Sequence, residues 1–285
     1  MHKIIACIDG SVSTNAVCDT AAWAAKRLNK PLLFLHTIER PQQHGADDLS
    51  GAIGLGARSN LLKEMAELDE KRAKLALSHG KAMLAAAHEH ASTSGVAEIE
   101  QKQRHGDIVD AISELEEQAR LIVVGRVGQG HSNQAPFKAL GSHIESLIRS
   151  VHTPLMIVPP AFSQPARFML AYDGRATADQ ALQKVIDGKL LTGLECHLVM
   201  VKNNTTGQAE KLANAQRLLT NQGFEVKASL LTGSISETLL DYQQQHNIDL
   251  LVMGAFAHSK VRRLFLGSHT IRMIEQCNIP LIVVQ

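Results

Sequence analysis

The chain of 285 residues is poor in aromatic residues, which make up 4% of it, and its formal net charge is only +1. Few aromatic rings leave little surface for stacking nucleic-acid bases, and balanced charge gives no broad field that attracts phosphate backbones or anionic lipids. The composition therefore disfavours nucleic-acid and membrane-surface binding. No apolar run approaches the ~18 residues that cross a bilayer, so no membrane span is expected.

Cysteine is also scarce, with single residues at Cys7, Cys18, Cys196 and Cys277. No Cys-x-x-Cys pair occurs, so the sequence predicts neither a zinc knuckle nor a disulfide framework. The first ten residues, MHKIIACIDG, lack the basic region and long apolar stretch of a signal peptide. We therefore expect reduced thiols and a cytoplasmic protein.

Internal repetition is abundant, because five short apolar segments of strand type recur in one order in two halves of the chain. The pairs are 3–11 with 167–175, 31–39 with 195–203, 97–107 with 224–234, 120–128 with 249–257, and 153–160 with 279–285. The repetition predicts two domains, 1–160 and 166–285, joined by a proline-rich linker.

Apolar residues recur at helical spacing between these strands. The expected helix pairs are 15–28 with 177–190, 108–119 with 235–245, and 142–150 with 268–277. Alternating strands and helices require crossover connections, which predict a mostly parallel sheet with helices on both faces. The expected class is α/β, with two tandem doubly wound domains of five parallel strands each.

The first half is longer than the second by an insertion of about 35 residues, at about 41–75, since the offset between paired strands falls from 164 to about 127. Residues 41–56 are rich in glycine and polar residues, which indicates a loop. Residues 58–91 form a long helical pattern that includes Met65, Leu68 and Leu75. We expect this helix to cover the core, and a lid or partner-docking helix is the functional alternative.

A glycine-rich segment joins the fourth strand to the third helix of each half, GRVGQGHSNQAPFKALGS at 125–142 and GAFAHSKVRRLFLGS at 254–268. Glycines let backbone N–H groups approach a phosphate closely, and the following helix adds its positive end. Such segments are often plain turns. Their recurrence before a Gly-Ser pair and a helix favours an anion site in each half.

The joint pattern resembles the universal stress protein family: a first strand ending in Asp-Gly-Ser, a second strand ending in a His-Val-type pair, and a motif Gly-x2-Gly-x9-Gly-Ser/Thr. The resemblance covers nearly the whole chain twice, apart from the insertion. It is closest to tandem members, whose halves pack as an internal pseudo-dimer. Many members of that family bind ATP between the strand ends, and others do not.

The resemblance also implies roles for individual residues. Aspartates would lie near the adenosine, residues of the second strand would line the adenine pocket, and glycines and serines would hold ribose and phosphates. In the first half these are Asp9, Thr37, Gly125, Gly128, Gly141 and Ser142, and in the second half Asp173, Met200, Gly254, Ala257, Gly267 and Ser268.

Both halves depart from the family's motif. Twelve residues, not nine, separate Gly128 from Gly141, and Ala257 stands where the second glycine of the motif belongs. An added methyl group hinders close backbone approach. Asp9 and Asp173 also have a plainer interpretation, since Asp-Gly after a strand is a common turn.

The leading hypothesis is a stress protein that binds ATP, with Mg2+, in one or both halves and regulates unidentified protein partners without catalysis. The alternative is an interaction or structural protein that has lost the nucleotide. A slow ATPase ranks third, because no GxSxG, HExxH or P-loop motif is present. The last strands of the halves would pair within one chain, and a homodimer of tandem chains is equally allowed.

Overall fold

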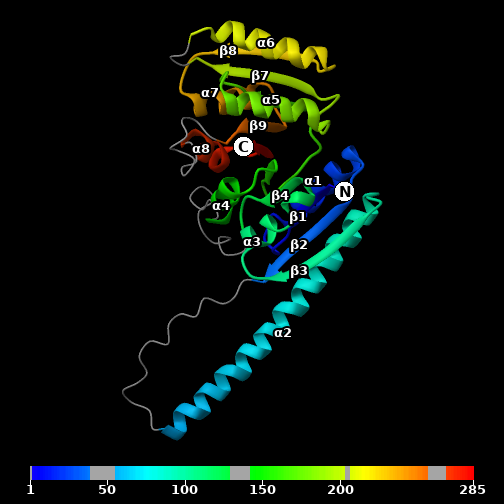
Figure 1. Cartoon of the computed structure of the whole chain (residues 1–285), viewed down its shortest axis with the longest axis vertical. Helices are drawn as coiled ribbons and strands as arrows, with labels where there is room; N and C mark the ends of the chain where they lie inside the picture. Colours follow the sequence, from blue (N-terminus) through cyan, green and yellow to red (C-terminus); the bar gives the residue numbers. More distant parts are fainter. Residues whose placement is uncertain (1, 39–54, 129–141, 203–205, 256–267) are drawn as a thin grey trace.

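The computed structural model describes residues 2–38, 55–128, 142–202, 206–255 and 268–285. In the first half the elements are β1 (Lys3–Cys7), α1 (Thr14–Leu28), β2 (Leu32–Ile38), α2 (Leu55–Thr93), β3 (Ile99–His105), α3 (Ile108–Ser113), η2 (Glu116–Gln118), β4 (Ala119–Gly125), α4 (Ser142–Ser150) and β5 (Leu155–Val158) (Figure 1).

The second half repeats this order along the chain. Its elements are β6 (Arg167–Ala171), α5 (Ala176–Gly188), β7 (Glu195–Val201), α6 (Gln208–Asn221), β8 (Val226–Leu231), α7 (Ile235–Gln245), β9 (Leu250–Gly254), α8 (Ser268–Gln276) and β10 (Leu281–Val284).

The strands form one ten-stranded sheet in the order β3-β2-β1-β4-β5-β10-β9-β6-β7-β8. All pairs within a half are parallel, so each half contributes five parallel strands. Parallel strands are buried on both faces, and the apolar run of β4 meets this requirement. The expected fold class is confirmed.

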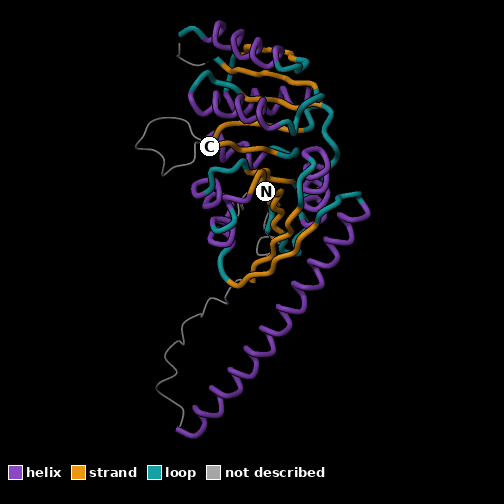
Figure 2. Tube along the Cα trace, turned by 45° about the vertical axis from the view of Figure 1, so that its right-hand side comes forward, coloured by secondary structure: helices purple, strands orange, loops and turns teal. Residues whose placement is uncertain are grey.

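Helices cover both faces of the sheet, as the alternating pattern predicted (Figure 2). The even-numbered side chains of β1, such as Ile4 and Ala6, pack with α1, α2, α5 and α6. Ile5 points to the other face, where the core includes residues of α3, α4, α7 and α8. Two apolar layers therefore enclose the sheet, one on each side.

The two halves meet where β5 and β10 pair antiparallel, with Met156 opposite Ile282. Both side chains are buried, and the pairing joins two five-stranded sheets into one. The pairing of last strands that we expected within one chain is therefore present.

The helices between the second and third strands differ most between the halves. α2 has 39 residues, whereas its counterpart α6 has 14. The sequence pattern predicted α2, but we did not predict α6. Only the last part of α2 packs on the sheet, and its first part extends away from the rest of the described chain (Figure 1).

No helix in the described part of the chain is both long and apolar enough to span a membrane.

Candidate functional site

Asp9 and Gly125 of the first half, and Asp173 and Gly254 of the second, lie where the chain leaves two neighbouring strands toward opposite faces. β1 and β4 are adjacent; α1, which follows β1, packs on one face, and α4, which follows β4, packs on the other. In open α/β sheets, ligands bind outside the carboxyl ends of strands at such a switch point. β6 and β9 form the equivalent point in the second half.

The aspartate after the first strand shapes the same turn in both halves. Asp9 Oδ1 accepts a hydrogen bond from the backbone N–H of Ser11 at 3.0 Å, and Asp173 Oδ1 accepts one from Arg175 at 3.0 Å. The glycine that follows each aspartate has a positive φ, 78° in Gly10 and 72° in Gly174. Glycine adopts this conformation at no steric cost, which explains why Asp-Gly recurs here.

Gly128 lies beside Asp9, so the two turns meet at the switch point of the first half. A Cβ atom added to Gly128 would be 3.3 Å from Asp9 Oδ2. Gly125, at the end of β4, packs even more closely on α1, since a Cβ atom there would be 2.7 Å from the Cβ of Ser13. The two glycines therefore have different functions, one in packing and one at the carboxylate.

The first turn of α1 brings hydroxyl groups to this point. Ser13 Oγ and Thr14 Oγ1 are buried, and no hydrogen-bond partner is found for either within the described residues. Ser13 precedes the helix without capping it through its side chain. A buried hydroxyl without a partner is costly, and a polar ligand would remove that cost. The residues present therefore fit a polar ligand at the positive end of α1.

The second half has cationic side chains at the equivalent turn. Arg175 forms an ion pair with Asp173 at 3.4 Å, and Lys211 of α6 donates a hydrogen bond to the carbonyl of Gly174 at 3.1 Å. A Cβ atom on Gly174 would be 2.7 Å from Cδ of Lys211, so this side chain lies directly across the turn. The turn of the second half is therefore more crowded and more basic.

Gly254 at the end of β9 corresponds to Gly125 and has the same packing function. A Cβ atom there would be 2.9 Å from the backbone carbonyl oxygen of Thr177, in the first turn of α5. Thr177 corresponds to Ser13 by the offset of 164 residues between the first strands. Both glycines therefore let the first helix of their half approach the fourth strand.

Thr37 and Met200 do not occupy equivalent positions. β1 pairs with β2 through Cys7 and Leu35, and β6 pairs with β7 through Ala171 and Val199. Counting from these pairs, Thr37 corresponds to Val201, and His36 corresponds to Met200. A shift of one residue along a strand places a side chain on the opposite face of the sheet.

His36 is therefore the residue of β2 that corresponds to Met200. Its Nδ1 lies 2.9 Å from the carbonyl oxygen of Ile8, just before Asp9. Met200 is fully buried in the core. His36 was not among the predicted site residues, although the offset of 164 residues between the first two strand pairs relates it to Met200.

Other predicted site residues are less fully described. Gly141, Ala257 and Gly267 lie outside the described residues. Ser142 and Ser268 begin α4 and α8, as expected, although their side chains are not described. Ser13, Thr14 and Lys211 were also not predicted. Ser13 and Thr14 do have a sequence signal, because they are hydroxyl residues shortly after the Asp-Gly turn, at the start of an amphipathic helix.

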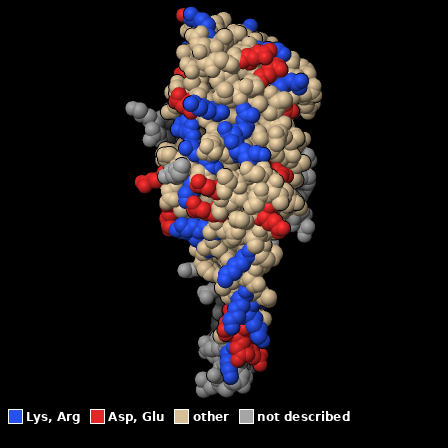
Figure 3. All heavy atoms as spheres, turned by 90° about the vertical axis from the view of Figure 1, so that its right-hand side faces the viewer, with Lys and Arg blue, Asp and Glu red and all other residues tan. Residues whose placement is uncertain are grey.

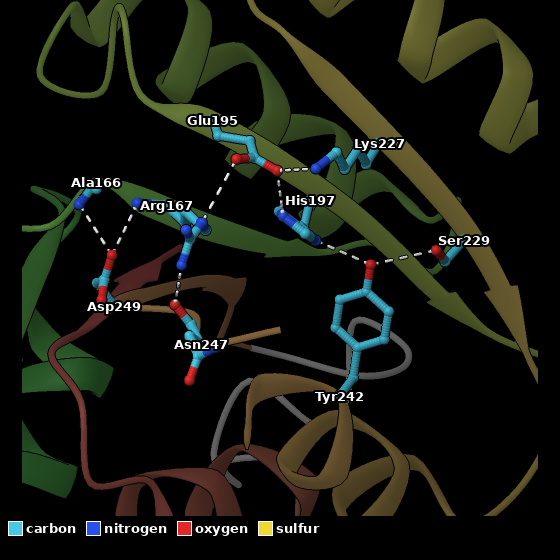
Figure 4. Close-up of polar contacts among 9 residues, drawn as sticks. All are labelled: Ala166, Arg167, Glu195, His197, Lys227, Ser229, Tyr242, Asn247 and Asp249. Atoms are coloured by element: carbon cyan, nitrogen blue, oxygen red, sulfur yellow. Dashed lines mark hydrogen bonds and ion pairs between the residues drawn. The ribbon is translucent and has the colours of Figure 1, made fainter. Parts of the chain in front are cut away.

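A second polar cluster lies in the second half, on the face covered by α7 (Figure 4). His197, 2% exposed, has Nδ1 2.9 Å from the Tyr242 hydroxyl and Nε2 2.9 Å from Glu195 Oε1. Glu195 also accepts a hydrogen bond from Lys227, and this bond is the main cause of the lowered pKa of Glu195. Burial lowers the pKa of His197, although Glu195 opposes this shift. Because Glu195 and His197 begin β7, the cluster lies away from the switch point.

A small cavity of about 50 Å³ lies at the junction of the halves. Its lining is mostly apolar and includes Leu28, at the end of α1, and Arg120, near the start of β4. It therefore lies toward the amino ends of the strands and is separate from the turns at Asp9 and Asp173. Within the described residues, no three metal-ligating side chains come together.

Comparison with known proteins gives consistent matches along the whole chain. The model of the universal stress protein family matches residues 1–159 and again residues 166–285. Universal stress protein Slr1230 of Synechocystis is 32% identical over 292 aligned residues, which cover 99% of each protein.

Solved structures agree in fold. The crystal structure of a universal stress protein from Archaeoglobus fulgidus matches with a TM-score of 0.70 at 21% identity, covering 99% of this chain and 98% of that one. A putative universal stress protein from Pseudomonas aeruginosa matches with a TM-score of 0.62 at 14% identity, covering 100% of this chain and 93% of that one.

Proposed function

Because the chain belongs to the universal stress protein family, we propose that it binds an adenine nucleotide, ATP, and regulates protein partners without turning it over. The main site is the switch point of the first half, between the turns after β1 and β4. Residues 1–160 and 166–285 act as two domains, of which the second is a weaker or secondary site.

The observation that supports this proposal best is the pair of buried hydroxyls, Ser13 Oγ and Thr14 Oγ1, for which the described residues offer no hydrogen-bond partner. Ser13 lies against Gly125, at the end of β4. Ser13 directly precedes α1 and Thr14 begins it, where backbone N–H groups also lack helical acceptors. Oxygen atoms of a nucleotide would accept hydrogen bonds from such donors. The side chains present therefore suit an oxygen-rich, anionic ligand.

Asp9 supplies the acceptor in this arrangement. Its Oδ1 accepts the hydrogen bond from the backbone N–H of Ser11 that shapes the turn. Its Oδ2 lies next to Gly128, where the lack of a side chain leaves room at the carboxylate. A ribose hydroxyl or an adenine amino group would donate to such an oxygen. Mg2+ would arrive with the phosphates rather than sit in a protein cage, since it keeps most of its ligands from water and phosphate.

The second half is less suited to the same ligand. Arg175 pairs with the carboxylate of Asp173, and the Lys211 side chain lies across Gly174. A nucleotide would have to displace both from their partners before it reached the aspartate. The two cations would still attract phosphates, so binding there is expected to be weaker and more sensitive to salt.

The test is ATP binding by variants in which each aspartate is changed separately. Asp9→Ala is expected to lower ATP affinity at least tenfold, and Asp173→Ala is expected to have a smaller effect. Asp249→Ala is the matched control, because Asp249 also accepts backbone N–H bonds, at 2.9 Å from Ala166 and from Arg167, at the start of β6. If Asp9→Ala binds ATP as well as the wild type, the assignment to the first half is wrong.

Protein binding without nucleotide is the second candidate function, and the exposed part of α2 favours it. Met65, Leu68 and Leu75 are about half exposed or more, which is unusual for large apolar side chains. The two functions are compatible, since this part of α2 is separate from the switch point. ATP that binds but is not hydrolysed would support a regulator over an ATPase.

We also propose that the protein works in the cytoplasm. The four cysteines are unpaired. Burial raises the pKa of Cys7, Cys18 and Cys196 to about 12, so these thiols remain protonated and unreactive at neutral pH. Such thiols suit a reducing compartment.

A further inference from the structure

The outer part of α2, residues 63–75, which we name the arm, has no described neighbour. Every residue of this range is exposed, whereas Gly80, Leu84, Ala87 and Ala91 further along the helix are buried against the sheet. Figures 1 and 2 show the arm extending beyond β3, clear of the other described elements. Thirteen helical residues span ~20 Å, long enough to contact a second molecule.

The arm has an apolar stripe that does not face its own domain. Met65, Leu68 and Leu75 are 51%, 48% and 70% exposed. At about 100° per helical residue, Leu68 and Leu75 lie within ~20° of each other, and Met65 lies within ~80° of Leu75. Leu75 and the core residue Leu84 are nine positions apart, which places them on opposite sides of the helix. The stripe therefore points away from the sheet that α2 covers.

Charge is divided along the arm. Apart from Lys63 at its outer end, the outer part has four acidic residues, and the next part toward the domain has three basic ones. The acidic residues are Glu64, Glu67, Asp69 and Glu70, and the basic residues of the inner part are Lys71, Arg72 and Lys74. Figure 3 shows both signs of charge gathered on the projecting helix.

We propose that the arms of two copies of this chain pair antiparallel through the apolar stripe, so that the protein forms a homodimer. Antiparallel pairing places the acidic part of each arm opposite the basic part of the other, whereas parallel pairing would place like charges together. The stripe has heptad spacing, with Leu68 and Leu75 seven residues apart and Met65 three before Leu68, as in a coiled-coil seam. This inference does not depend on nucleotide binding.

The expected contacts follow from this geometry. With the two-fold axis near Glu70, Met65 of one copy packs beside Leu75 of the other, and Leu68 packs beside the aliphatic part of Arg72. Two ion pairs within the arm, Lys74 to Glu70 at 2.7 Å and Arg72 to Asp69 at 3.7 Å, compete with contacts between copies. Both pairs are exposed, and exposed pairs contribute little, so they would exchange readily.

Other occupants of the stripe fit less well. The stripe faces away from its own domain, so a lid over that domain would require α2 to turn about its axis. A membrane surface would favour a basic polar face, whereas the outer part of the arm is acidic. A second copy meets both the apolar and the charge requirement.

The first test is the molar mass in solution, measured by sedimentation equilibrium across the micromolar range. We expect the wild type to dimerise and Leu68→Glu/Leu75→Glu to weaken dimerisation at least tenfold, because each change places a charge in the seam. Leu218→Glu is the matched control, since Leu218 is 53% exposed on α6, and it should dimerise as the wild type does. A monomeric wild type, or a double variant that dimerises normally, would overturn the proposal.

The second test fixes the orientation of the arms by disulfide trapping. Met65→Cys mixed with Leu75→Cys should form a cross-linked heterodimer on mild oxidation, and each variant alone should cross-link poorly. The wild type, oxidised in the same way, is the control for cross-links formed by the four native cysteines. Efficient cross-linking of Met65→Cys alone would show parallel arms and overturn the antiparallel arrangement. These readouts involve no nucleotide, so they are independent of the proposed function.

Discussion

Gly128 lies against Asp9, and a Cβ atom at position 128 would be 3.3 Å from Asp9 Oδ2. The two residues are 119 positions apart, and the parallel pairing of β1 with β4 brings the ends of their strands together. Ser13 and Thr14 present buried hydroxyls nearby in the chain, at the start of α1. This junction is the basis of the proposed nucleotide site.

Gly128→Ala is expected to weaken ATP binding while leaving the fold intact. Gly128 has no positive φ, so alanine fits the backbone, but its methyl group would reach the Asp9 carboxylate. We expect at least a tenfold loss of affinity, measured by calorimetric titration. Gly188→Ala is the control, because the nearest atom to its Cβ, on Arg120, is 4.0 Å away. Unchanged affinity in Gly128→Ala would place the ligand elsewhere.

Alanine at the two packing glycines is expected to destabilise the fold in both halves. A Cβ atom at Gly254 would meet the backbone carbonyl oxygen of Thr177 at 2.9 Å, and one at Gly125 would meet Cβ of Ser13 at 2.7 Å. Neither atom is the end of a flexible side chain, so the backbone at the start of the first helix must shift to relieve each contact. We expect a loss of about 1–3 kcal/mol for Gly254→Ala and for Gly125→Ala, measured by urea denaturation. Unchanged stability in either variant would contradict this account of the packing.

The second half is expected to lose stability as the pH falls below about 6.5, the ordinary pKa of histidine. Burial lowers the pKa of His197 in the folded state, so the unfolded state takes up the proton first and is favoured by acid. The lowered pKa of Glu195 acts in the same direction at lower pH. Thermal unfolding between about pH 5 and 8 measures the effect.

The control variant for this pH effect is taken from the first half. There, the positions that correspond to His197 and Tyr242 are occupied by Leu33 and Leu115, which are both buried and do not titrate. The double variant His197→Leu/Tyr242→Leu should therefore unfold with a weaker dependence on pH than the wild type between about pH 5.5 and 7. An equally strong dependence in the double variant would assign the effect to other groups.

Arg126→Ala is expected to weaken the junction of the halves. The Arg126 guanidinium donates a hydrogen bond to the carbonyl of Cys277 in the other half, and burial lowers the pKa of Arg126. Its loss leaves that carbonyl without this donor, which costs about 1–3 kcal/mol. Arg120 also reaches the other half, through the carbonyl of Asp187, but this bond is exposed. Arg120→Ala should therefore cost less in the same denaturation experiment.

The sequence predicted the fold well because the two halves share one pattern of strands. Each apolar strand recurs in order, so β1, β4 and β9 were found without ambiguity. α6 was missed, since only Leu212, Ala215 and Leu219 of its apolar residues are buried, and the exposed Leu218 blurs the helical stripe. The sequence also predicted one helix over 108–119, where α3 ends at Ser113 and a short η2 follows.

The site was only partly predictable from sequence. The Asp-Gly turns and the glycines after β4 and β9 are local features, so their positions could be read directly. The contact of Gly128 with Asp9 depends on the register between distant strands. The Lys211 side chain across Gly174 depends on how α6 packs. Met200 was paired with Thr37 because a one-residue shift between similar apolar strands leaves little trace in composition.

The most direct test of the central claim is the nucleotide content of the purified protein. Protein prepared without added ligand is denatured, and the supernatant is separated by anion exchange against nucleotide standards. We predict ATP or ADP at close to one per chain in the wild type and much less in Asp9→Ala. A wild type that carries no nucleotide, and whose melting temperature does not rise with saturating ATP and Mg2+, would contradict the account, because a ligand that binds the folded state must stabilise it.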